Sequence, residues 1–196
     1  MYKKQMTFQR VVCLLAIVAS ALVFLYALGM MTDLYDMLYT QIPDPEDASS
    51  VKVAGAMIYY DMQDFNRLLL RAGIGLVLLA CLLMITNPHS RRKYYIGNYA
   101  AVALNVVAHV AVAIWAHLQI AAFKAQYLST IDFEQLERRL RRAGTYTEST
   151  FWFDAHWIVF AFTLIVVCLL ILNTIWKKQV MNEERSLIEA GKAVSA

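Results

Sequence analysis

Four long apolar runs constrain what this chain can fold into more than any other feature of its sequence. The runs cover residues 11–31, 68–86, 94–123 and 151–176. A helix needs roughly 20 mostly apolar residues to cross about 30 Å of hydrocarbon. A soluble domain of 196 residues, 60% of them hydrophobic here, has no interior large enough to bury all four runs. The sequence therefore predicts an all-α integral membrane protein, a four-helix transmembrane bundle that forms one domain over residues 1–196.

The distribution of charge between the runs predicts the orientation. Basic residues gather before the first run, between the second and third, and directly after the fourth: Lys3, Lys4, Arg10, Arg91, Arg92, Lys93, Lys177 and Lys178. By the positive-inside rule both termini are cytoplasmic, and residues 32–67 and 124–150 form two outer loops. The arginines of the second outer loop oppose this assignment, but they lie far from the spans. We expect a multi-pass protein of the cell membrane, either a plasma membrane or a bacterial inner membrane.

The second outer loop has the pattern of an amphipathic helix. Phe133, Leu136 and Leu140 recur at spacings of three and four and share one face. Acidic and basic residues four apart fit the other faces as the pairs Glu134–Arg138 and Glu137–Arg141. Such a helix could lie on lipid or cover a partner, and it could equally cover its own bundle.

Polar residues inside the third run form a stripe. Asn98, Asn105 and His109 fall on one face of a helix with alanines beside them. Small residues let helices approach closely, and amide or imidazole groups can hydrogen-bond across the contact. The stripe predicts contacts between helices, with a proton or ligand path as the alternative.

A second polar group is expected near the outer ends of the spans. Because the third span runs outward and the fourth inward, His117 and His156 come to similar depth. Asp154 lies nearer the water, and Arg71 in the second run should lie at comparable height. An arginine in an apolar run needs a counter-charge, so we expect a network of these four side chains.

The same two histidines raise the question of a cofactor. Two imidazoles on neighbouring helices can hold a haem b, and with Asp154 they resemble a three-ligand metal site. The latter pattern is common by chance, so no metal is predicted, and haem at His117 and His156 stays an alternative. The three cysteines each lie in a different span, where no disulfide framework is expected.

Motifs leave three functional classes open. The chain has no phosphate-binding loop, no dinucleotide-binding glycines and no hydrolase motif, so it is not predicted to be an enzyme. Its net charge of +3 does not indicate nucleic acid as a partner. The sequence fits best a non-catalytic accessory subunit of a multi-protein membrane complex, such as a transporter. A homo-oligomeric small transporter or channel, lined by the Asn98–Asn105–His109 stripe, and a haem- or metal-binding redox subunit are the alternatives. The expected partners are the lipid bilayer and either other membrane subunits or further copies of the chain.

Overall fold

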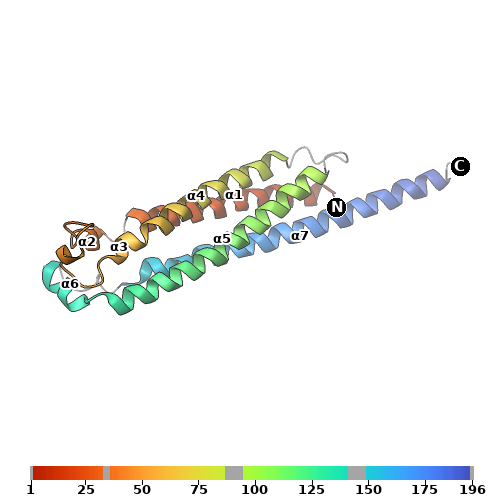
Figure 1. Cartoon of the computed structure of the whole chain (residues 1–196). Helices are drawn as coiled ribbons and strands as arrows, with labels where there is room; N and C mark the ends of the chain where they lie inside the picture. The colour runs from red at the N-terminus through yellow and green to blue at the C-terminus, as the bar shows by residue number, and fades with distance from the viewer. Residues whose placement is uncertain (1, 33–35, 87–94, 141–148, 195–196) are drawn as a thin grey trace. The chain divides into compact units, whose positions relative to one another are not determined.

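The structure, a computed structural model, describes residues 2–32, 36–86, 95–140 and 149–194, and most of them are helical (Figure 1). Four helices dominate it: α1 (Tyr2–Thr32), α4 (Gln63–Thr86), α5 (Tyr95–Thr130) and α7 (Phe151–Val194). Short elements occur between them: α2 (Asp36–Tyr39), the 3₁₀ turn η1 (Ala48–Ser50), α3 (Ile58–Asp61) and α6 (Phe133–Leu140). No β-strand occurs in these ranges.

The prediction of four membrane-spanning helices is confirmed in its coarse form. Four helices are long and apolar enough to cross a membrane. Each extends beyond the apolar run that predicted it, most of all α7 with 44 residues, because hydropathy marks only the part suited to hydrocarbon. The orientation of the termini and the outer position of α6 stay predictions. Three of the basic residues behind that orientation, Arg91, Arg92 and Lys93, lie outside the described residues.

Contacts within the chain divide it into two compact units, which we describe separately. The first unit comprises Met1–Ser20, Leu76–Val110 and Phe162–Ala196. The second comprises Ala21–Gly75 and Ala111–Ala161.

Small and aliphatic side chains from all four long helices form the core of the first unit. They are Val12, Cys13, Ala16, Ala19, Ala80, Leu83, Ala101, Val102, Val166 and Leu170. Alanine is the commonest type among them, and small residues allow helix backbones to approach in a lipid environment. This close approach brings the polar groups of one helix within reach of its neighbours.

Glycine allows a close helix contact in the second unit. A Cβ added to Gly73 of α4 would lie 2.9 Å from the Cα of Phe24 on α1. Only a residue without a side chain fits against that backbone. At Gly75, one half-turn along the same helix, an added Cβ would meet nothing within 4 Å.

The segment before α4 also packs inside the second unit. Gly55 has a positive φ of 78°, and an added Cβ would lie 2.3 Å from the carbonyl oxygen of Thr130. Its neighbour Ala54 accepts a hydrogen bond from the Asp132 backbone N–H at 3.3 Å and donates one to Gln135 Oε1 at 3.3 Å. The turn therefore lies against the junction of α5 and α6.

Candidate functional site

The polar stripe of α5 hydrogen-bonds to the three other long helices of the first unit. Nδ2 of Asn105 donates to the carbonyl of Leu79 on α4 at 3.0 Å. Nε2 of His109 lies 2.9 Å from Oγ of Ser20 on α1. Oδ1 of Asn98 accepts from Nζ of Lys177 on α7 at 2.6 Å. These contacts favour the interpretation of the stripe as a set of bonds between helices, because its polar groups are engaged within the protein.

Not every polar atom of this stripe has a hydrogen-bond partner. Oδ1 of Asn105 and Nδ2 of Asn98 are buried without a hydrogen-bond partner among the described residues. A buried polar atom left unpaired costs roughly 1–3 kcal/mol. The stripe therefore contributes less stability than its number of hydrogen bonds suggests.

Sequence reasoning missed the polar residues that extend this network. Lys177, counted only as a basic flank of the last span, is 4% exposed. Near the start of α1, Nε2 of Gln5 donates to Oε1 of Gln9 at 3.1 Å and to Oδ1 of Asn173 on α7 at 3.0 Å. The spacing of four between Gln5 and Gln9, which puts both amides on one face, was the available signal.

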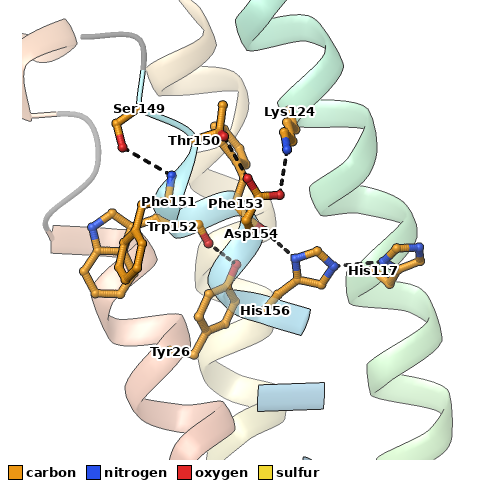
Figure 2. Close-up of polar contacts among 10 residues, drawn as sticks. All are labelled: Tyr26, His117, Lys124, Ser149, Thr150, Phe151, Trp152, Phe153, Asp154 and His156. Atoms are coloured by element: carbon orange, nitrogen blue, oxygen red, sulfur yellow. Dashed lines mark hydrogen bonds and ion pairs between the residues drawn. The ribbon is translucent and has the colours of Figure 1, made fainter. Parts of the chain in front are cut away.

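His117 and His156 lie together in the second unit, as their expected depths predicted (Figure 2). Nδ1 of His117 on α5 lies 2.9 Å from Nε2 of His156 on α7. Nδ1 of His156 is hydrogen-bonded to the backbone carbonyl of Phe153. The ring of Trp157 lies beside both, with centroids 4.7 Å from His117 and 5.1 Å from His156.

The expected network of four side chains was wrong in the cation that pairs with Asp154, which is Lys124 and not Arg71. Lys124 Nζ lies 2.6 Å from Asp154 Oδ1, and Thr150 Oγ1 donates to Asp154 Oδ2 at 2.7 Å (Figure 2). Arg71 is exposed and takes part in no ion pair among the described residues. Lys124 follows His117 by two helical turns on the same face of α5, so its side chain reaches the start of α7. Sequence reasoning placed Lys124 in the outer loop and did not consider it.

Tyr26 adds a third helix to this region. Its hydroxyl donates to the carbonyl of Trp152 at 3.1 Å (Figure 2). Its ring centroid lies 6.2 Å from that of Phe160. The bond links α1 to the first turn of α7, two residues before Asp154. No motif in the sequence indicated it.

The histidine pair does not fit a haem. An iron between two axial imidazoles separates their nitrogens by roughly 4 Å, twice a metal–nitrogen bond of about 2 Å. The facing nitrogens of His117 and His156 are 2.9 Å apart and bonded to each other. No group of three or more metal-binding side chains occurs in the ranges that the structure describes. Asp154, the third side chain of the pattern that resembles a metal site, is bonded to Lys124 and Thr150.

The side chains assigned to partner binding on α6 pack within the chain. Leu136 is fully buried, and the ring of Phe133 lies 5.3 Å from that of Tyr127 on α5. On its other side, Glu134 and Arg138 form an ion pair. The side chain of Leu140 and the whole of Arg141 lie outside the description. These contacts favour the alternative in which α6 covers its own bundle.

Comparison with protein-family models, with curated proteins and with solved structures found no match.

Proposed function

We propose that this chain is a non-catalytic accessory subunit of a larger membrane complex and that the end of α7 binds the partner subunit. One observation carries the proposal. Past Lys177, α7 continues to Val194, and every residue from Asn182 to Gly191 is exposed. The exposed stretch includes two adjacent aliphatic side chains, Leu187 at 73% and Ile188 at 37% exposure.

Such a segment gains little from its own chain. Isolated helices shorter than about 12–15 residues are marginal in water, and most helical stability in proteins comes from packing one face against a neighbour. The described part of the chain supplies no neighbour for Leu187. Covering this segment with another subunit would supply that packing.

The charges of the segment favour a foreign subunit over a second copy. Within the exposed residues 182–191, Glu183, Glu184 and Glu189 outnumber Arg185, and Lys178 and Lys192 lie on either side of this stretch. Two copies in one membrane have the same orientation, so their α7 helices would run parallel and bring equal acidic residues together. Like charges at such a contact are destabilising, whereas a partner with a basic surface would attract the segment.

The other two functional classes receive less support. A transport path would need the polar groups of the α5 stripe to face a lumen, yet Asn98, Asn105 and His109 are bonded to Lys177, Leu79 and Ser20. A haem does not fit between His117 and His156. Both sets of residues are engaged in contacts that hold helices together.

The test is affinity purification of the tagged full chain from its own membrane in mild detergent, with the bound chains identified by mass spectrometry. Full-length protein is expected to retain foreign subunits in stoichiometric amount. The double variant Leu187→Ser with Ile188→Ser removes the proposed contact. Burying an aliphatic side chain is worth roughly 1.5–3 kcal/mol, so retention should fall at least about tenfold.

A matched control changes two exposed, uncharged residues on the opposite face of the same helix, Asn182→Ser with Ser186→Ala. This variant should retain the partners. Recovery of the full chain alone, as a monomer or a homo-oligomer, would contradict the accessory role. Equal retention by both double variants would show that a partner binds elsewhere and would exclude the end of α7.

A further inference from the structure

The hydrogen bond to Phe153 determines where His156 carries its proton. A backbone carbonyl can only accept, so Nδ1 of His156 must be the N–H donor. A neutral imidazole has one N–H and one lone pair. Neutral His156 therefore presents the lone pair of Nε2 to His117.

That lone pair determines the state of His117 in turn. The hydrogen in the 2.9 Å contact must come from Nδ1 of His117. With both rings neutral, the pair thus holds two N–H protons, and each Nε2 carries a lone pair. The lone pair of His156 Nε2 accepts the hydrogen bond from His117, so Nε2 of His117 is the one nitrogen that takes no part in the bonds within the pair or to Phe153. In Figure 2 this nitrogen points away from His156.

The two rings respond differently to added protons. A first proton can bind Nε2 of His117, which leaves the contact with His156 intact and makes it a charge-assisted hydrogen bond. A second proton can bind only Nε2 of His156. Two N–H groups would then face each other with no acceptor between them, and two like charges would lie at the same short distance.

We propose that His117 and His156 form a one-proton site, which takes up one proton with its contact preserved and is separated by a second. Because the rings belong to α5 and α7, the second proton would loosen the contact of these helices within the second unit. The inference does not rest on the accessory role proposed above.

The charged groups around the two histidines already have partners of their own, so we expect an added proton to bind to the histidine pair. The charged groups near His156 are Asp154 on its own helix and Lys124 on α5, which are paired with each other. Tyr26 on α1 donates its hydroxyl hydrogen to the carbonyl of Trp152. Among the described residues, no titratable side chain of α4 is one of the groups that act on His156.

The first test is the tautomer, measured by NMR of protein labelled with ¹⁵N-histidine. The chain has only four histidines, so His117→Gln and His156→Gln assign the two signals. At pH 8 both residues are expected in the Nδ1–H form. An Nε2–H form at either residue would overturn the proposal.

The second test follows Trp157 while the pH falls from 8 to 4.5, a range that spans the ordinary imidazole pKa of about 6.5. Charged imidazole quenches a neighbouring indole, so protonation of the pair should lower the emission of Trp157. That emission is the part of the fluorescence that is lost in Trp157→Phe. Two steps are expected in the native protein, since coupled sites titrate as a pair. His117→Gln should leave one step, and His89→Gln, the matched control, should leave both. A native response unchanged by His117→Gln, or a single step in the native protein, would contradict the proposal.

Discussion

The contacts inside the first unit differ in kind from the contacts inside the second. In the first unit, amides, a buried lysine and small core residues connect the helices, and Phe8–Trp176 is the one ring pair that the described residues provide. In the second unit, ring pairs are frequent, from Tyr26–Phe160 to Tyr127–Phe153, and a glycine lies directly against a neighbouring backbone. The first unit therefore depends on polar bonds between close helices, and the second on the fit of large side chains.

This difference has an energetic consequence. A hydrogen bond between helices in a membrane contributes about 0.6 kcal/mol on average, because the unfolded chain also finds polar partners there. Removing a large buried ring costs roughly 3–5 kcal/mol. The second unit should therefore be sensitive to changes of volume, and the first tolerant of losing single polar groups.

The largest effect is expected at Phe153. Its side chain is fully buried, with its ring 5.4 Å from Tyr127. Phe153→Ala should lower the free energy of unfolding by about 3 kcal/mol, measured by titration with SDS in mixed micelles. Phe151 lies two residues earlier and is 64% exposed, so Phe151→Ala is the matched control with little effect. Equal losses in the two variants would break the comparison between the units.

A smaller effect is expected at Gly73. The Cβ of Gly73→Ala would meet the backbone of Phe24, which cannot rotate away as a side chain could. Overpacking of this kind costs about 1–3 kcal/mol. Gly75→Ala adds the same methyl group to the same helix in open space and should be neutral or slightly stabilising. A stable Gly73→Ala variant would show that α1 and α4 can separate at no cost.

The aromatic residues also show what the sequence could predict. Hydropathy alone located four helices that are long and apolar enough to cross a membrane, since length and composition decide whether a helix can cross hydrocarbon. It could not tell that Phe153 points inward and Phe151 outward, because runs apolar on every face carry little periodicity. The closeness of His117 and His156 followed from the opposite directions of the third and fourth runs, which put the two residues at similar depth. The partner of Asp154 did not, because Arg71 and Lys124 differ in which way they face, and depth carries no information on that.

Asn105 tests the expectation that the first unit tolerates the loss of a single polar side chain. Its side chain bonds α5 to the carbonyl of Leu79 on α4, while its own Oδ1 is unpaired. Asn105→Ala should therefore cost only about 1 kcal/mol, since the variant also removes a buried atom without a partner. Leu104→Ala, at a half-exposed neighbour, is the control for lost side-chain volume. A loss as large as that of Phe153→Ala would show that the first unit depends on this bond more than we infer.

The smallest effect is expected at the charged pair of the second unit. The side chains of Lys124 and Asp154 are 32% and 46% exposed, and partly solvated pairs of this kind contribute about 1 kcal/mol or less. Lys124→Met removes one contact of Asp154, whereas Asp154→Asn weakens that contact and the hydrogen bond from Thr150 as well. Asp154→Asn should therefore destabilise more than Lys124→Met, and the effect of Lys124→Met should shrink at high salt as screening weakens the native pair. Arg71→Met removes an exposed cation that has no ion-pair partner in the described part of the chain, and it should leave the unfolding midpoint unchanged. If Arg71→Met destabilised the protein more than Lys124→Met, Arg71 would be the charge that balances Asp154. The sequence first indicated this partner, because it places Arg71 at a depth comparable to that of the two histidines.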